Sequence, residues 1–344
     1  MTQHEITKPH ALLDENGHLV EAGYAKRMIL DYDRKMIKAN SLRIKEWDYY
    51  LIYNNDFAVA LTVDDNSYMA LDSISLIDFR IPWEHTNSPM KFMTRGSRNF
   101  PSSSKTGNVV GEGNGYRIEF LKERDRRILN FRMDDFMDSK PIEGSITLYD
   151  DDPESMIIAT PYKESKVHFY YNQKINCLPA DGKVTFDGKD YIFSPLSSYG
   201  TLDWGRGVWT YKNTWYWGSA SGNVDGHDFG FNIGYGFGDT SAASENMLFY
   251  DGKAHKLSRV VFNIPEKNGK DDFMSDWTFT SDDGRFEMDF KPVLDRASNT
   301  DFIILGSNQH QVFGRFTGKA ILDDGTEINI KDFMGFAEKV RNKW

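Results

Sequence analysis

The sequence is poor in cysteine and has no long apolar run. Its single cysteine, Cys177, cannot form an intrachain disulfide, so a disulfide-stapled scaffold is excluded. Without about 18 consecutive apolar residues, the chain offers no transmembrane helix. Residues 1–10 also lack the apolar region of a secretory signal, so a soluble, cytoplasmic protein is expected.

Positive charge is also scarce. The chain has 41 Lys and Arg against 51 Asp and Glu, a formal net charge of −10, and no basic face is visible. A nucleic-acid binder needs such a face to neutralise phosphates, and an anionic membrane surface would repel this chain. Neither is an expected partner, and nothing in the sequence sets an oligomeric state.

Motifs for metal, phosphate and serine-nucleophile chemistry are missing. The eight histidines show neither HxH nor HExxH spacing, although a metal site assembled in three dimensions stays open. Residues 111–115 are glycine-rich but have no helical pattern after them, so they form no phosphate loop. No GxSxG elbow occurs. The sequence therefore predicts no metal and no cofactor.

Aromatic residues, by contrast, are abundant at 14%. Aromatics favour β-strands and also line ligand pockets. Apolar and charged residues alternate with period two at 116–120 and 285–290, which is typical of half-buried antiparallel strands. Asp-Gly pairs such as Asp187-Gly188 and Asp324-Gly325 lie between such runs and supply the positive φ of tight hairpins.

Helical spacing is rare. It appears in residues 24–37, where an irregular strap fits equally well, and in 332–344, where one short helix is expected. Residues 97–113 are rich in Ser, Asn and Gly and predict a long loop, either functional or mobile. We therefore predict an all-β fold of antiparallel barrels or strongly curved sandwiches with little helix.

The segment 199–245 carries most of the functional information. If the chain is extended from Trp209 onward, one face gathers aromatic and amide side chains: Trp209, Tyr211, Asn213, Trp215 and Trp217. Its partner strand, 229–238, has large residues on one face and glycines on the other, broken only by Asn232. Such glycines leave room for an opposing aromatic layer, a barrel corner or a ligand. Amides among aromatics favour a small-molecule pocket, and its candidate ligand-binding residues also include Trp204 and Asn246.

Candidate acid–base groups surround this segment. Asp203 precedes the tryptophans, Arg206 is close enough in sequence to pair with it, and His227 is expected in the turn between the two strands. Glu245 and Asn246 follow the glycine-rich strand. A carboxyl group in an aromatic pocket has a raised pKa and can donate a proton near neutral pH. A structural ion pair, a solvated turn and a loop cap are the alternative roles of Asp203–Arg206, His227 and Glu245.

Three motifs give the chain a family resemblance: residues 202–209 (LDWGRGVW), 215–218 (WYWG) and 245–252 (ENMLFYDG). They resemble the uncharacterised domain-of-unknown-function 2804 family over most of the chain. The Asp203-Trp204-Gly205 motif is more distantly similar to the lipocalin-like hydroxyneurosporene synthase (carotenoid hydratase) group. That group carries Asp-His-x-Trp-Gly, whereas here Trp204 directly follows Asp203, a departure from the hydratase pattern.

The resemblance implies two lipocalin-like barrels in tandem. The first would span 1–255 and hold an apolar ligand in an aromatic pocket. The second, smaller barrel would span 256–344, with residues 302–304 among its strands.

Three functions follow from these patterns. The first is an enzyme that hydrates, isomerises or cyclises a hydrophobic small molecule, with Asp203 or Glu245 as the acid and the Trp face stabilising a cation. The second is a carrier of a lipid or similar ligand that performs no chemistry. The third is a carbohydrate-active enzyme that uses Asp203 and Glu245 as its carboxylate pair.

Overall fold

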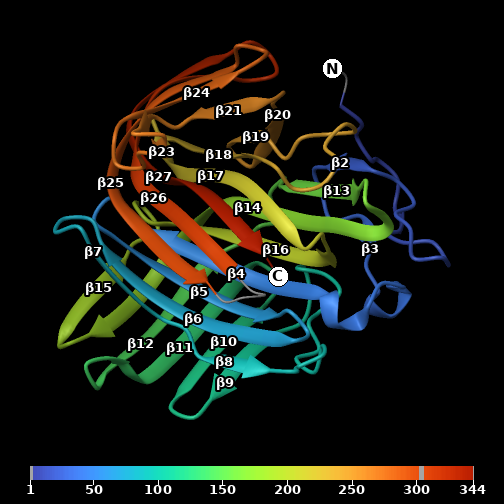
Figure 1. Ribbon diagram of the computed structural model, residues 1–344. Helices are drawn as coiled ribbons and strands as arrows, with labels where there is room; N and C mark the ends of the chain where they lie inside the picture. The colour runs from blue at the N-terminus through green and yellow to red at the C-terminus, as the bar shows by residue number, and fades with distance from the viewer. Residues whose placement is uncertain (1–2, 302–305, 344) are drawn as a thin grey trace.

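Alternating side chains build two curled antiparallel sheets in the computed structural model, which describes residues 3–301 and 306–343 (Figure 1). The expected all-β fold with little helix is confirmed, because helix is confined in these residues to the single 3-10 turns Arg34–Met36 and Ser41–Arg43. Residues 302–304, expected in a strand, lie outside the described residues.

The first sheet holds most of the N-terminal strands. Its hydrogen-bonded order is β7 (Trp83–Asn87), β6 (Met69–Asp78), β5 (Phe57–Asp65), β4 (Lys45–Tyr53), β16 (Tyr199–Val208), β14 (Ser165–Phe186), β12 (Lys140–Tyr149), β11 (Arg126–Met137), β10 (Tyr116–Lys122), β9 (Val109–Gly113). Four further strands attach to it: β2 (Gly23–Ala25), β8 (Met90–Phe92), β13 (Met156–Tyr162) and β15 (Lys189–Phe193).

The second sheet is built from the C-terminal part of the chain. Its order is β20 (Lys253–Lys256), β19 (Met247–Tyr250), β18 (His227–Tyr235), β17 (Lys212–Val224), β27 (Glu327–Lys343), β26 (Gly306–Ile321), β25 (Phe286–Asp301), β24 (Trp277–Ser281), β21 (Val260–Asn263). Two small pairs complete the fold: β1 (His10–Ala11) with β3 (Leu30–Asp31), and β22 (Glu266–Lys267) with β23 (Lys270–Asp271). In the described parts of the chain, no helix is both long enough and apolar enough to cross a membrane.

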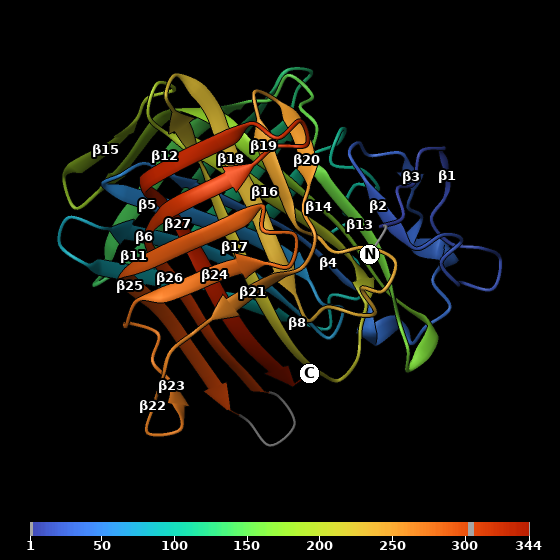
Figure 2. The same cartoon turned by 90° about the horizontal axis from the view of Figure 1, so that it is seen from above.

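The division between the sheets falls between Val208 and Lys212. The strands within residues 212–255, which the resemblance placed in the first barrel, therefore pair within the second sheet. Figure 2 shows the strands of this sheet crossing over those of the first. The organisation into domains 1–255 and 256–344 stays a prediction, but the hydrogen-bonded sheets change over earlier in the chain.

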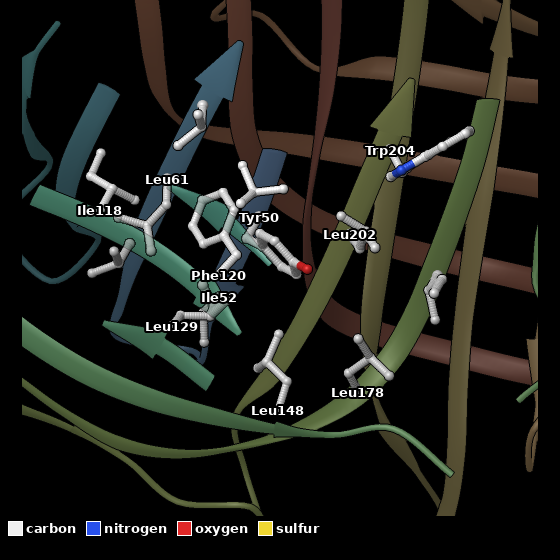
Figure 3. Packing of buried hydrophobic residues seen from close by; sticks show 14 of the residues in the cluster. Tyr50, Ile52, Leu61, Ile118, Phe120, Leu129, Leu148, Leu178, Leu202 and Trp204 are labelled. Atoms are coloured by element: carbon white, nitrogen blue, oxygen red, sulfur yellow. The ribbon is translucent and has the colours of Figure 1, made fainter. Parts of the chain in front are cut away.

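Each sheet curls around its own apolar interior. In the first sheet, side chains such as Ile52, Leu61, Ile118 and Trp204 fill this space, as Figure 3 shows. The second sheet encloses a cluster dominated by phenylalanines and Trp277. A third cluster joins the outer faces of the two sheets, where Leu51 of β4 packs with residues such as Phe313 and Phe336. Because strand residues alternate between faces, the residues opposite the interiors line the space between the sheets.

The Asp-Gly hairpins are confirmed. Asp187 and Gly188 have φ of 49° and 73° between β14 and β15, and Asp251 and Gly252 have φ of 45° and 74° between β19 and β20. Gly325, between β26 and β27, has φ of 89°. In the first two hairpins both central residues have positive φ, the geometry that matches the twist of flanking strands, whereas in the third only the glycine does.

Two local expectations changed, and at residues 24–37 one of the two alternatives was confirmed. The helix predicted for 332–344 is wrong, because β27 runs through this segment and pairs with both β17 and β26. Residues 24–37 form the irregular strap, with β3 and one 3-10 turn. The loop predicted for 97–113 ends earlier, since β9 begins at Val109. Pro101 in this loop accepts a hydrogen bond from Arg206 (3.2 Å), so the loop closes one end of the first sheet.

Candidate functional site

A cavity of about 230 Å³ lies between the outer faces of the two sheets. Strands β4, β14 and β16 contribute one wall, and β17, β26 and β27 contribute the other. On β16, Asp203 points into the cavity, whereas its neighbour Trp204 points into the packed interior. The resemblance implied a pocket inside the first barrel, but apolar side chains fill that interior and the cavity lies behind it.

Aromatic rings form one end of the cavity. The ring of Trp47 stacks on Tyr170, with centroids 6.2 Å apart and planes 14° apart, and meets Trp209 edge-on at 5.3 Å. Phe237 contacts the rings of Tyr170, Trp209 and Trp215, at 4.5, 5.2 and 5.1 Å. These contacts hold the rings in edge-on and offset arrangements, so they form a preorganised apolar surface.

A buried ion pair lies beside this aromatic surface. The Nζ of Lys174 is 2.8 Å from Oδ1 of Asp203, and the side-chain amide of Asn172 donates to the same oxygen at 2.7 Å. The ammonium group also lies 4.2 Å from the ring centroid of Trp217. A cation over an indole face is attracted by the ring quadrupole. The pair therefore places one fixed positive and one fixed negative group at the aromatic wall.

Glu338 is the second buried acid of the cavity. It accepts a hydrogen bond from Nε1 of Trp215 at 3.0 Å and another from Nε2 of Gln311 at 3.2 Å. Burial raises the pKa of Glu338 to about 7, against the opposing effects of Trp215 and the Arg296 and Lys174 charges. Since this pKa lies near neutral pH, Glu338 exchanges a proton under ordinary conditions.

Glu245 is the third acid, and the glycine-rich strand makes room for it. A Cβ at Gly234 would lie 3.2 Å from Cδ of Glu245 and 2.7 Å from the carbonyl oxygen of Tyr216. At Gly230 a Cβ would lie 2.6 Å from Sγ of Cys177. The glycines of β18 thus accommodate protein side chains. Burial raises the pKa of Glu245, and the Asp203 charge adds to the rise while Lys174 opposes it.

Asn232 links two of the cavity residues. Its Oδ1 accepts a 2.7 Å hydrogen bond from Nε1 of Trp217, and its Nδ2 donates to the backbone oxygen of Glu245 at 2.8 Å. Asn232 is fully buried and does not line the cavity. It therefore positions Trp217 and Glu245 from outside the cavity. It was predicted as a ligand-binding residue only because of the aromatic and glycine residues around it in the sequence.

The cavity also borders a buried lysine and acid at this aromatic end, where Asp64 lies directly opposite Trp47 in the strand register. Asp64 and Asn66 line this end, and the Nζ of Lys45 lies 5.2 Å from the ring of Trp209. Burial raises the pKa of Asp64 to about 7 and lowers the pKa of Lys45 to about 7. Among the described residues, no group of three or more His, Cys, Asp or Glu side chains is arranged to hold a metal ion.

Five predicted site residues thus line the cavity: Asp203, Trp209, Trp215, Trp217 and Glu245. The predicted Asp203–Arg206 pair is wrong, because the two side chains lie on opposite faces of β16. Arg206 instead contacts Asp48 at 3.1 Å and the ring of Trp204 at 4.1 Å inside the first sheet. Trp204 is likewise a core residue.

The other predicted residues lie elsewhere. His227 begins β18, after the turn and not in it, and pairs with Asp251 at 2.7 Å on the surface. Tyr211 is 40% exposed in the connection between the sheets. Asn213 braces that connection through Thr210, at 2.6 Å. Asn246 accepts from the amide of Gly234 at 2.7 Å and holds the loop after β18.

Sequence reasoning missed Trp47, Lys174, Gln311 and Glu338. A signal for Lys174 was present, since Tyr170, Asn172 and Lys174 are spaced two residues apart and so share a face if the segment is a strand. Glu338 closes the apolar run 333–337, which was assigned to a helix. Treated as a strand, this run would have placed Glu338 and Asn342 on one face.

The contact between Gly205 and Trp47 gives a testable consequence. A Cβ at Gly205 would lie 1.9 Å from Cζ2 of Trp47, so Gly205→Ala must displace this ring from the cavity wall. We expect the free energy of unfolding to fall by about 1–3 kcal/mol, as in overpacked cores. Urea denaturation measures the loss, and near-UV circular dichroism reports the ring. Gly218→Ala is the matched control, since its Cβ would meet nothing closer than 3.1 Å. An equal loss in both variants would contradict this account.

Solved structures of similar fold were compared with the chain. A provisionally assigned AttH protein of Nitrosomonas europaea has a TM-score of 0.54 at 13% identity, covering 90% of this chain and 96% of that one. Kievitone hydratase of Nectria haematococca has a TM-score of 0.46 at 10% identity, covering 87% and 88%. CghA bound to Sch210972 has a TM-score of 0.47 at 11% identity, with the same coverages.

Comparison of the sequence identifies a family but no individual relative. No curated protein matches the chain. The likeness to the AttH protein supports the lipocalin-like, all-β fold and says nothing of activity. One family model does match, over residues 3–344. The chain therefore belongs to the family described as Domain of unknown function (DUF2804).

Proposed function

We propose that this protein is an acid–base enzyme that hydrates, isomerises or cyclises a hydrophobic small molecule in the cavity between its sheets. The observation that carries the proposal is Glu338, a buried carboxyl group whose pKa is raised to about 7 within an aromatic wall. A neutral carboxylic acid in an apolar cavity is suited to protonate an alkene or enol. The tryptophan faces support the choice of an apolar substrate.

In the proposed reaction, Glu338 or Glu245 gives its proton to a carbon of the substrate double bond. The neighbouring carbon becomes cationic, and the face of Trp215 stabilises it. In a hydration, the oxygen of water bonds to this carbon and its surplus proton returns to the carboxylate. In an isomerisation, the substrate itself loses a proton to the carboxylate. Asp203, fixed by Lys174, orients the polar group of the substrate or accepts the proton.

Native mass spectrometry of the freshly purified protein is the first experiment. An apolar molecule carried by the protein would identify the ligand, and its release unchanged under all conditions would support a carrier. The identified compound, or alkenes and enols related to it, then serves for turnover assays. We expect Glu338→Gln to reduce kcat at least a hundredfold, as loss of a general acid does.

Asp203→Asn and Glu245→Gln test the predicted catalytic carboxylates in the same assay. If neither of these variants nor Glu338→Gln changes turnover, the acid–base mechanism is wrong. Cleavage of aryl glycosides that depends on both Asp203 and Glu245 would favour the carbohydrate alternative. His227→Ala is the control, because its side chain lies on the surface beside Asp251 and outside the cavity lining.

A further inference from the structure

One row of cavity side chains runs across three neighbouring strands of the second sheet, β25, β26 and β27 (Figure 2). In the strand register, Arg296 of β25 lies directly opposite Gln311 of β26, and Gln311 lies directly opposite Glu338 of β27. Residues that face each other across an antiparallel pair project from the same face of the sheet. All three side chains line the cavity, so a guanidinium group, a carboxamide and a carboxyl group stand side by side along one wall.

Arg296 brings hydrogen-bond donors to this row that the described part of the protein does not use. In that part of the chain its one hydrogen-bond partner is the hydroxyl of Ser75, which accepts from Nη1 at 2.9 Å. Among the described residues no carboxylate forms an ion pair with Arg296, whereas Lys174 is paired with Asp203 at 2.8 Å. A guanidinium group carries five N–H donors in a planar fork, so Arg296 can still bind an oxygen atom of a ligand.

Tyr49 supplies a second donor from the facing wall of the cavity. Its hydroxyl oxygen accepts a hydrogen bond from Nε2 of Gln311 at 3.4 Å, which places the hydroxyl beside the row. A tyrosine hydroxyl also donates one hydrogen bond, and the residues that the structure describes offer it no acceptor. Burial raises the pKa of Tyr49 and of Glu338, and the positive charge of Arg296 opposes both rises. Arg296 is therefore electrostatically coupled to the hydroxyl and to the acid.

We infer that the substrate is an unsaturated ketone whose carbonyl oxygen binds the Arg296 guanidinium and the Tyr49 hydroxyl. The inference rests on the proposed function and names the substrate class. Donors that are fixed in a buried site stabilise the negative charge that develops on an oxygen atom during a reaction. Asp203, Glu245 and Glu338 already line the cavity, and these acids disfavour a substrate that is permanently anionic. A ketone avoids this repulsion because it is neutral until the reaction begins.

The reaction that fits this arrangement is the isomerisation of a β,γ-unsaturated ketone. The Glu338 carboxylate takes a proton from the α-carbon, the electron pair of the C–H bond forms a double bond to the carbonyl carbon, and the carbonyl π pair moves to the oxygen beside Arg296. The pair then returns and re-forms the C=O bond, the double bonds shift to the α,β position, and the γ-carbon takes the proton from Glu338. The charge of this intermediate lies on oxygen, in place of the carbocation that an isolated alkene forms.

Three naphthalenes of similar size test the inference by equilibrium dialysis: 2-naphthol, 2-methylnaphthalene and 2-naphthoate. The hydroxyl of 2-naphthol, on a conjugated ring, mimics the enol of the substrate. The methyl compound lacks the oxygen, and the naphthoate is permanently anionic. We expect 2-naphthol to bind about tenfold tighter than 2-methylnaphthalene, because its oxygen gives Arg296 and Tyr49 the hydrogen-bond partner that the methyl group cannot.

Arg296→Met and Tyr49→Phe should each remove most of the advantage of 2-naphthol. Their affinity for 2-methylnaphthalene should stay unchanged, which also shows that the cavity is still folded. Arg132→Met is the matched control, because this arginine pairs with Asp134 on the surface at 2.7 Å. Equal affinities of the wild type for 2-naphthol and 2-methylnaphthalene, a preference for 2-naphthoate, or an advantage that survives both substitutions would overturn the inference alone. If none of the three probes binds, the inference falls together with the apolar binding that the proposed function requires.

Discussion

Arg206→Met is expected to lower the free energy of unfolding by about 3–5 kcal/mol, the usual cost of removing one partner of a buried ion pair. The Arg206 side chain is fully buried and lies 3.1 Å from Asp48 and 3.9 Å from Glu46. It also donates to the backbone oxygens of Trp47 and Gly205, both at 2.8 Å. Met has a similar volume, but it removes the guanidinium group from beside the buried Asp48 carboxylate. Burial already raises the pKa of Asp48 even with Arg206 beside it.

A second substitution separates charge from packing. Asp48→Asn removes the unpaired charge, so the double variant Arg206→Met/Asp48→Asn should recover part of the loss in a urea-denaturation cycle. The experiment also decides the role of Arg206, which the sequence offered as a catalytic residue. A stable Arg206→Met protein with impaired turnover would show that Arg206 acts in chemistry and contradict its structural role.

Glu338→Gln should change the pH dependence of stability. The folded-state pKa is raised from 4.5 to about 7, so the folded protein binds this proton more tightly than the unfolded chain. The stabilisation is complete below pH 4.5 and is lost as the pH rises through 7. In the wild type the free energy of unfolding therefore falls by about 3 kcal/mol over this range, and the variant lacks this decrease. Relative to the wild type, Glu338→Gln should therefore gain about 3 kcal/mol of stability between pH 4 and pH 8.

Other acids of the cavity, including Asp64 and Glu245, also have raised pKa values, so the wild-type curve alone is not specific. Urea denaturation at several pH values in wild type and variant gives the required difference. Glu266→Gln, on the exposed strand β22, is the matched control and should follow the wild-type profile. A difference between Glu338→Gln and wild type that stays constant with pH would contradict the raised pKa of Glu338.

The strand content was predictable where a strand has one exposed and one buried face, as in 116–120. The same logic failed at β27, where residues 333–338 are all buried. Burial on both faces removes the two-residue alternation from this run, so its apolar residues also fit a helical spacing, and only pairing with β17 and β26 decides its conformation. The boundary between the two sheets could not be predicted either, because it depends on which distant strand each segment pairs with.

Only one wall of the candidate site could be predicted from the sequence, for a related reason. Trp215 and Trp217 lie on one face of β17 as predicted, but the chain crosses between the sheets at 209–211, so the alternation is interrupted there. Tyr211 consequently faces solvent, while Trp209 reaches the cavity from the connection. Residues of the facing wall, such as Lys174 and Glu338, come from segments far away in sequence. A local pattern identifies one wall of such a site and cannot supply the other.

The order of strands in the second sheet has a consequence for folding kinetics. β17 pairs with β27, so Lys212 meets Lys343 only after the whole intervening chain has been placed. Pairings between such distant segments form slowly, because closing the long intervening loop costs conformational entropy before any stabilising contact is made. Glu338 and Asn342 arrive with β27, whereas Asp203 needs the equally distant union of β16 with β4. Assembly of the cavity should therefore be among the last events of refolding, after each sheet has regained its secondary structure.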